Sequence, residues 1–216
     1  MFFSSFKSYS EIESKYPIIL TGDTKDPYEK EVIDIYNGHA NLNLCQQDST
    51  GLLYNHLGNY EKFVRNNEIA AVRCYGKSCE KNCIIAYVNL ADYVEDIERK
   101  ISLLEKAIVL GGTSSILYFK LIETYMCVPV TEERENRVAR LIQLIMKKCD
   151  EPHVIVALGQ IFVDANDIDT AGNILLLAKK LFDQNTSSYK CKEGLSRCNY
   201  LLIKLCYARE VMKKKN

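Results

Sequence analysis

HVIVALGQIFVDANDIDTAGNILLLAKKLF, which runs from His153 to Phe182, is the stretch that decides the fold of this chain. In its first half, Ile155, Leu158, Gly159 and Phe162 are spaced at i, i+3, i+4 and i+7, which places them on one face of a helix. A glycine inside a helix costs about 1 kcal/mol relative to alanine, so it is tolerated best where a neighbouring helix approaches closely. The DANDID segment that follows suits a tight turn and a helix N-cap.

The second half of the stretch continues as another helix, in which two small residues flank a large one. Ala171, Leu175 and Ala178 repeat at i, i+4 and i+7. The whole stretch therefore predicts two short helices folded against each other. A helical hairpin of this size cannot bury its apolar face alone, so several hairpins must stack around a continuous core.

Weaker copies of the first helix precede this stretch. They contain Tyr54, Tyr87 and Tyr118, which together with Ile155 are separated by 33, 31 and 37 residues. The order of large, large, small and large residues, a turn, then small, large and small residues resembles the tetratricopeptide repeat. The related Sel-like repeats, which are slightly longer on average, are an alternative. The chain departs from the tetratricopeptide pattern in having no Trp, and Asp183 stands where a proline often closes the repeat.

The resemblance implies an all-α fold, a short right-handed α-solenoid of about four helical hairpins. Residues 1–50 are expected to form an N-terminal leader or cap, residues 51–183 the tetratricopeptide-like repeats, and residues 184–216 a C-terminal capping helix with a basic tail. Within the leader, capping and turn residues predict a helix from Pro27 to Asn37. The polar segment from His39 to Thr50 is expected to be a loop.

The last helix is expected from Ser188 to Lys213. The terminal element of a solenoid has to be apolar toward the stack and polar toward solvent. Charged residues are expected on the outer side, at Lys204, Arg209 and Glu210. The expected inward stripe consists of Cys191, Leu195, Cys198, Leu202 and Leu205.

Charge and hydropathy indicate the compartment. The 216-residue chain has 28 Lys and Arg and 28 Asp and Glu, so no net charge favours nucleic acid or an anionic membrane. No basic start with an apolar run, and no apolar stretch of about eighteen residues, is present. We therefore expect a cytoplasmic protein in a reducing compartment. Frequent Lys, Ile, Asn and Tyr without Trp are typical of AT-rich genomes, and for a viral protein the compartment would be the host cytoplasm.

Nine cysteines are expected to be free thiols, because their number is odd and no secretion signal is present. Most lie among apolar residues on the expected helices, where cysteine behaves as a small buried hydrophobe. The alternative is a metal site at Cys74, Cys79 and Cys83, which lacks the nearby second Cys pair or His of many zinc sites. The sequence therefore predicts no metal or other cofactor.

Motifs that carry catalysis are missing from the sequence. There is no Walker sequence, no GxSxG and no HExxH, and the three histidines lie in different expected elements. DANDID lacks the Gly and the distal Glu of an EF-hand calcium loop. The sequence therefore predicts no catalytic residues and a protein that is not an enzyme.

The tetratricopeptide resemblance also implies where a partner binds, because the first helices of that family line a concave groove that receives a peptide or a helix. Apolar residues at several lining positions favour a contact surface, and an ordinary solvated face is the alternative. The implied partner-binding residues are Asn55, Asn59, Lys62, Val88, Asp92, Glu95, Phe119, Glu123, Met126, Val156, Gln160 and Val163.

We expect a non-enzymatic protein–protein interaction scaffold whose partner is another protein, bound as a peptide or an amphipathic helix. Asp92, Glu95 and Glu123 favour basic residues in that partner. The lining lacks the paired Lys and Arg of the family's carboxylate clamps, which disfavours a chain-terminal carboxylate. A helical-repeat RNA-binding protein and a structural or assembly subunit of a larger particle are the alternatives. Neither nucleic acid nor a membrane is an expected partner, because phosphate binding needs clustered cations.

Overall fold

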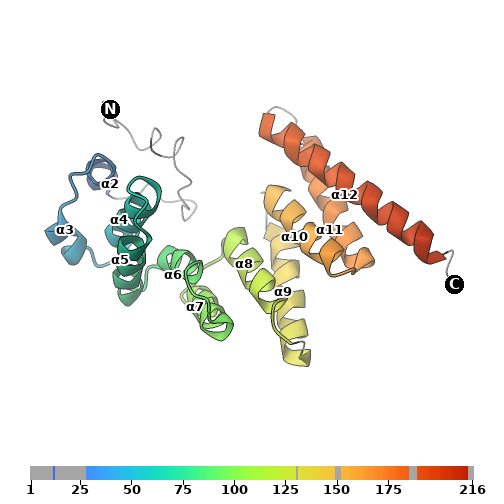
Figure 1. The fold of residues 1–216 in the computed structure, drawn as a ribbon, viewed down its shortest axis with the longest axis horizontal. Helices are drawn as coiled ribbons and strands as arrows, with labels where there is room; N and C mark the ends of the chain where they lie inside the picture. Colours follow the sequence, from blue (N-terminus) through green and yellow to red (C-terminus); the bar gives the residue numbers. More distant parts are fainter. Residues whose placement is uncertain (1–11, 13–27, 130, 149–151, 185–188, 214–216) are drawn as a thin grey trace. The chain divides into compact units, whose positions relative to one another are not determined.

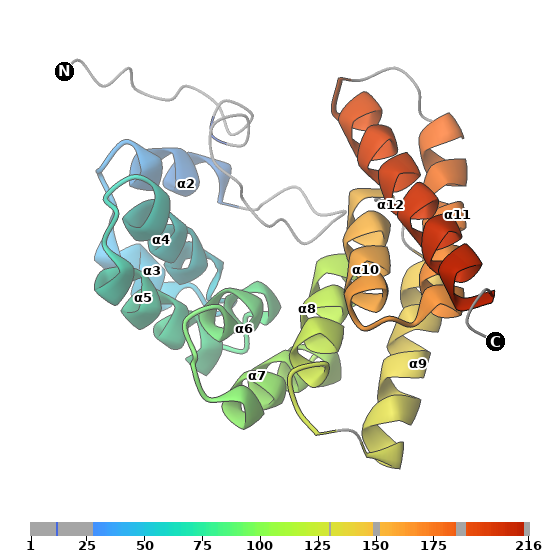
Figure 2. The same ribbon diagram turned by 45° about the vertical axis from the view of Figure 1, so that its right-hand side comes forward.

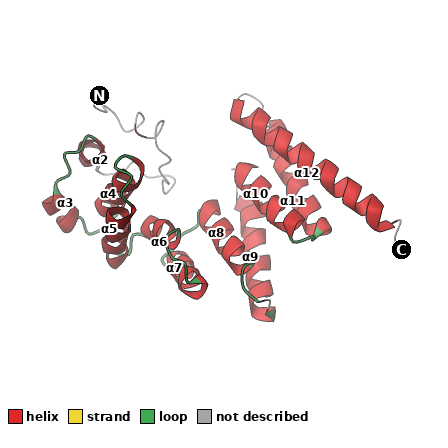
Figure 3. Ribbon diagram, viewed as in Figure 1, coloured by secondary structure: helices red, strands yellow, loops and turns green. Residues whose placement is uncertain are grey.

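Helices make up all the regular structure in the part of the chain that the computed structural model describes. Those residues are 12, 28–129, 131–148, 152–184 and 189–213. They form eleven helices and no strand, which confirms the predicted all-α class (Figures 1 and 3). The chain divides into two compact units, residues 1–117 and 118–216. Among the described helices, none combines the length and the apolar run that crossing a lipid bilayer demands.

The first unit consists of helical pairs that follow one another along the chain. Helix α4 packs on α5, α6 packs on α7, and α5 also contacts α6 (Figure 2). Ala71, Tyr75 and Ser78 of α5, which are spaced at i, i+4 and i+7, are buried. The helices of this unit are α2 (Glu29–Tyr36), α3 (Leu42–Gln47), α4 (Leu52–Phe63), α5 (Glu68–Glu80), α6 (Ile84–Ala91) and α7 (Ile97–Val109).

The second unit contains the stretch that predicted the fold. Helices α10 and α11 pack against each other, and α12 packs on both. All four residues of the first-helix pattern, from Ile155 to Phe162, are buried, and so are Ala171, Leu175 and Ala178. Helix α8 (Ser115–Tyr125) begins in the first unit and continues into the second. The other helices are α9 (Glu132–Lys148), α10 (Pro152–Asp164), α11 (Ile168–Gln184) and α12 (Tyr189–Lys213).

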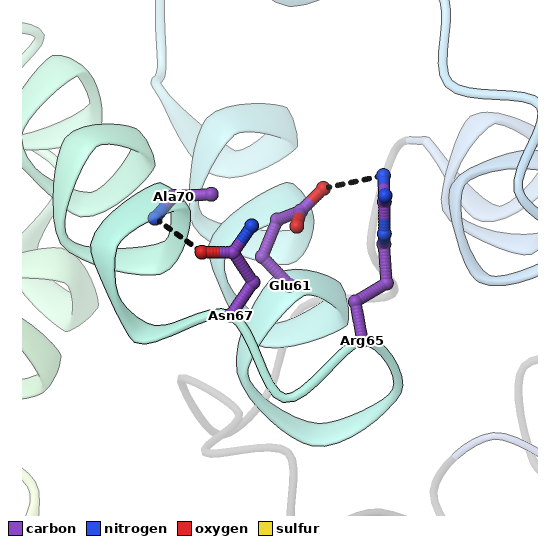
Figure 4. A network of polar contacts seen from close by, with 4 residues as sticks. All are labelled: Glu61, Arg65, Asn67 and Ala70. Carbon is purple, nitrogen blue, oxygen red and sulfur yellow. Dashed lines mark hydrogen bonds and ion pairs between the residues drawn. The ribbon is translucent and has the colours of Figure 1, made fainter.

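The turns inside the α4–α5 and α10–α11 pairs share one construction. Asn66 and Asn166 adopt φ values of 52° and 60°, a left-handed conformation that asparagine tolerates better than most residues. The next residue caps the second helix: Asn67 accepts a hydrogen bond from the Ala70 amide, and Asp167 accepts one from the Thr170 amide, both at 3.1 Å. Figure 4 shows the Asn67 cap next to the ion pair between Glu61 of α4 and Arg65, which follows that helix. The predicted turn and N-cap at DANDID are therefore confirmed.

The segment after α2 differs from the sequence prediction. Helix α2 lies within the predicted span and is followed by Gly38 with a φ of 84°. The predicted loop from His39 to Thr50 was wrong, because it contains the short helix α3. The Asn41 side chain starts that helix by accepting hydrogen bonds from the amides of Asn43 and Leu44 at 3.0 and 3.3 Å.

Asp48 fixes the start of α4. Its carboxylate is 4% exposed and accepts hydrogen bonds from the Thr50 and Leu53 amides at 2.8 and 2.9 Å. The hydroxyls of Thr50 and Tyr28 donate to it as well. Burial acts to raise the pKa of Asp48, but these hydrogen bonds outweigh it and hold the pKa below its ordinary value. Asp48 is therefore a charged anchor inside the first unit.

Lys81 ties the α5–α6 turn to the same region. Its ammonium group donates a 2.9 Å hydrogen bond to the carbonyl oxygen of Gln46 and a second one to the carbonyl oxygen of Asp48. The group also lies 6.0 Å from the centroid of the Tyr54 ring, within the range of a cation–π interaction. One side chain thus connects α3, α4 and the turn that follows α5.

The inward face of α12 is rotated from the predicted stripe. Cys198 and Leu205 are buried as predicted, whereas Leu195 and Leu202 are half-exposed. The Cys191 side chain lies outside the described residues. The buried face runs instead through Gly194, Cys198, Leu201 and Leu205.

The physical reason for this rotation lies at Gly194. A Cβ atom there would lie 2.4 Å from Phe182 and 2.7 Å from His153, so only a glycine permits the close approach of α12 to α10 and α11. The sequence prediction chose the inward face from its large apolar residues, and a glycine does not count among them. The predicted stripe therefore followed the leucines instead.

We expect Gly159→Ala to destabilise the second unit. A Cβ atom on Gly159 would lie 2.6 and 2.7 Å from the Leu175 side chain, so Leu175 rather than Ala178 is its nearest partner in α11. Overpacking of this kind typically costs about 1–3 kcal/mol. The measurement is the free energy of unfolding from urea denaturation.

Gly76→Ala is the matched control, because Gly76 is also helical and a Cβ atom there meets nothing within 4 Å. Its helix propensity alone should make that variant about 0.5–1 kcal/mol more stable. Two variants that shift stability in the same direction would contradict the close contact at Gly159.

Candidate functional site

The predicted partner-binding residues of the first repeat lie in a buried polar cluster. Asn55 and Asn59 of α4 are only 1% and 2% exposed. Asn59 Oδ1 accepts a hydrogen bond from the Tyr75 hydroxyl at 2.8 Å, and Asn55 Oδ1 accepts one from Asn89 Nδ2 at 2.9 Å. Asn89 Nδ2 also lies 3.5 Å from Asn59 Oδ1. We call Asn55, Asn59, Tyr75 and Asn89 the amide cluster.

The amide cluster joins the first helices of two successive repeats to the helix between them. Asn89 was absent from the sequence prediction, because the 33-residue interval from Tyr54 to Tyr87 pairs Asn55 with Val88, the residue before it. No periodic signal in the sequence marks Asn89. The Nδ2 atoms of Asn55 and Asn59 are buried and have no hydrogen-bond partner. A buried donor without a partner destabilises the folded state by about 1–3 kcal/mol, so these two amide groups reduce the stability that the cluster contributes.

Lys62, the third predicted residue of this repeat, lies over aromatic rings. Its ammonium group is 5.0 Å from the Phe63 ring centroid and 5.1 Å from that of Tyr93. The Tyr93 ring is in turn 6.1 Å from that of Tyr75. These contacts are cation–π and aromatic interactions, which hold Lys62 beside the amide cluster.

The predicted residues of the second repeat differ in exposure. Val88 is buried at 3% exposure, whereas Asp92 and Glu95 are exposed. Asp92 is the C-cap of α6, and Glu95 lies in the connection before α7. Both carboxylates belong to the first unit and Glu123 to the second. The convergence of these three groups on one surface stays a prediction.

The second unit presents its predicted residues more openly. Glu123 and Met126 are exposed, Met126 to 42%, and Phe119 is half-exposed. These three residues follow the i, i+4, i+7 spacing of one helix face, along α8 and just beyond its end. We call Phe119, Glu123 and Met126 the α8 face.

The predicted residues of α10 fall into two groups. Val156 is buried at 3% exposure, whereas Gln160 and Val163 are half-exposed. Gln160 Nε2 donates a hydrogen bond to Asp164 Oδ1 at 2.8 Å, so its amide is partly engaged within its own helix. Gln160 and Val163 therefore offer less free surface than the α8 face.

The cysteines of the alternative metal site are packed as apolar groups. Burial, followed by the nearby Glu61 charge, raises the pKa of Cys74 to about 11. Burial, followed by Cys83, raises the pKa of Cys79 to about 12. The described residues contain no group of three or more His, Cys, Asp or Glu that could hold a metal ion. Burial thus disfavours the thiolate form of Cys74 and Cys79.

Comparison with known proteins finds similar chains among the solved structures. No protein-family model matches the chain, and no curated protein matches it. The chain is similar in structure to YrrB, described as a TPR protein with an unusual peptide-binding site. The similarity covers 78% of this chain and 97% of that one, at 15% sequence identity and a TM-score of 0.46. The evidence for the all-α fold of this chain is its own described helices and the contacts between them.

We expect Asn89→Ala to destabilise the first unit by about 1–3 kcal/mol, because Asn55 Oδ1 loses its hydrogen-bond donor in a buried place. Asn173→Ala is the control, since Asn173 is exposed on α11. Surface changes of that kind usually stay within about 0.5 kcal/mol. Chemical denaturation of both variants measures the difference. Equal stability of Asn89→Ala and the parent protein would show that the amide cluster contributes nothing to folding.

We also expect the thiols to react in two classes. Cys127 and Cys206 are exposed, whereas Cys45, Cys79 and Cys83 are buried, and burial raises the pKa of each of these three. A short pulse of iodoacetamide at neutral pH, read by mass spectrometry, should label the exposed pair first. Labelling in urea should reach all nine cysteines of the chain. Rapid labelling of Cys79 in the native protein would contradict this packing.

Proposed function

We propose that this chain is a non-enzymatic interaction scaffold that binds another protein, as a peptide or an amphipathic helix, through its repeat surface. The observation that carries the proposal is the α8 face. Phe119 on α8 is half-exposed and Met126, just beyond the end of α8, is 42% exposed, whereas Leu117, Leu121 and Ile122 of the same helix are fully buried. Apolar side chains aligned on an exposed helix face are typical of a contact surface.

Glu123 lies between the two apolar residues of the α8 face and gives the proposal its chemistry. An exposed ion pair contributes only about 0–1 kcal/mol. The apolar side chains are therefore expected to provide the affinity, and Glu123 to favour a partner segment with Lys or Arg. Val163 of α10, another predicted lining residue, is half-exposed and belongs to the second unit as well. The proposed surface lies within the second unit.

The raised pKa values of the described cysteine and tyrosine side chains support a binding role over a catalytic one. Every cysteine and tyrosine with a clearly shifted pKa has it raised, and burial is the first cause in each case. A nucleophile is activated by the opposite change, a lowered pKa or an adjacent base. These thiols and hydroxyls therefore support packing and hydrogen bonding.

We expect Phe119→Ala to weaken partner binding more than Asp92→Asn does, because the apolar contact carries more of the affinity than one exposed charge. The measurement is capture by the intact tagged protein from an extract, followed by titration of the captured partner. Val109→Ala is the control, because Val109 is 75% exposed on α7 and outside the proposed surface. If the partner still binds when Phe119→Ala and Met126→Ala are combined, the α8 face is not the site.

A further inference from the structure

Helix α12 exposes a second apolar face. Tyr200, Ile203 and Tyr207 are 64%, 70% and 74% exposed, and their spacing of i, i+3 and i+7 places them on one side of the helix. The opposite side packs on α10 and α11 through the face that includes Gly194 and Leu201. We call Tyr200, Ile203 and Tyr207 the outer stripe. The predicted capping helix is therefore apolar on both sides.

The outer stripe is larger than scattered surface residues would explain. The last element of a helical repeat stack normally turns a polar face to solvent. A buried aromatic side chain covers about 150–250 Å², so the three side chains together expose on the order of 400 Å². That value is typical of a functional patch on a monomer, which covers about 300–600 Å². The stripe thus has the size of a helix-docking surface.

Among the side chains of α12 that the structure describes, charge lies along one edge of the outer stripe. Arg197 and Lys204 are seven residues apart, so they lie along the same edge, and both are exposed. The other edge carries the uncharged residues Asn199 and Cys206. Glu193 is the acidic residue described on this side, one turn before Arg197. The sequence from Tyr200 to Asn216 contains five basic residues and one acidic residue, which reinforces the positive sign.

The positive charge along this edge distinguishes between the molecules that could cover the outer stripe. An antiparallel second copy of α12 would place the basic edge against its own counterpart, which like charges disfavour. A helix that lies in a membrane interface keeps a polar face opposite its apolar face. The opposite face of α12 is packed on α10 and α11. A helix with acidic residues beside its apolar stripe fits both the outer stripe and the basic edge.

We propose that the outer stripe of α12 docks an amphipathic helix of another protein, whose apolar residues are bordered by Asp or Glu. The docked helix covers Tyr200, Ile203 and Tyr207, and its carboxylates lie along Arg197 and Lys204. The apolar contact provides the affinity, and the ion pairs fix the direction of the docked helix. This surface is separate from the α8 face and requires a partner segment of opposite charge.

The test uses the full chain and two synthetic peptides of about 20 residues, long enough to form a helix. Both peptides carry leucines at i, i+3 and i+7; one has Glu along the edge of the stripe and the other has Lys. Fluorescence anisotropy at low salt should show the Glu peptide binding at least about tenfold more tightly. Arg197→Glu combined with Lys204→Glu should reverse the preference, and Ile203→Ser combined with Tyr207→Ser should abolish binding of the Glu peptide. These residues are exposed, so the packed face of α12 is unchanged.

The controls are Val109→Ser and Lys106→Glu, which make the same kinds of change on exposed positions of α7. Combined Phe119→Ala and Met126→Ala should leave binding of the Glu peptide intact, which separates this proposal from the α8 face. The proposal is overturned if the wild-type protein does not prefer the Glu peptide, or if the double charge reversal keeps that preference. It is equally overturned if the two serine substitutions abolish self-association in sedimentation velocity, or binding to anionic phosphatidylserine vesicles, because the occupant would then be a second copy or a membrane.

Discussion

Two of the helical pairs depend on a glycine that lets a bulky side chain of the second helix lie against the backbone of the first. A Cβ atom at Gly58 would lie 2.5 Å from the Tyr75 ring, just as one at Gly159 would lie 2.6 Å from Leu175. Any larger residue would push the paired helices apart. In the first unit the consequence extends further, because the close approach brings the Tyr75 hydroxyl to Asn59. The amide cluster that joins two repeats thus depends on the absence of a side chain at Gly58.

The separation between interior and surface decides which residues are available to partners. Asn55, Asn59, Val88 and Val156 occupy positions that the repeat pattern assigns to a partner-binding face, yet they are buried. Their role in this structure is to hold helices together. The surfaces that we propose for recognition are the α8 face and the outer stripe of α12. The first has an acidic residue at its centre and the second a basic edge, so under these proposals the two surfaces select partner segments of opposite charge.

The sequence predicted the helical pairs well because their spacing is a direct consequence of helix geometry. The pattern from Ile155 to Phe162 and the cap after DANDID depend on residues near one another in the chain. The helix α3 was missed because one asparagine, Asn41, starts it within a polar segment. The burial of Asn55 and the rotation of α12 toward Gly194 result from contacts between helices. Such contacts leave no periodic signal in one sequence, so the candidate site could be predicted only in part.

The Lys81 contacts have a chemical consequence. A lysine amine is normally nucleophilic when its proton is lost, but here the group is held by the carbonyl oxygens of Gln46 and Asp48. Acylation would remove both its charge and most of its donors, so it would cut the connection between α3 and the α5–α6 turn. The native fold should therefore protect this amine from acylating reagents, while an exposed lysine such as Lys106 is modified freely. The acylation rate of one side chain then becomes a reporter of local opening in the first unit.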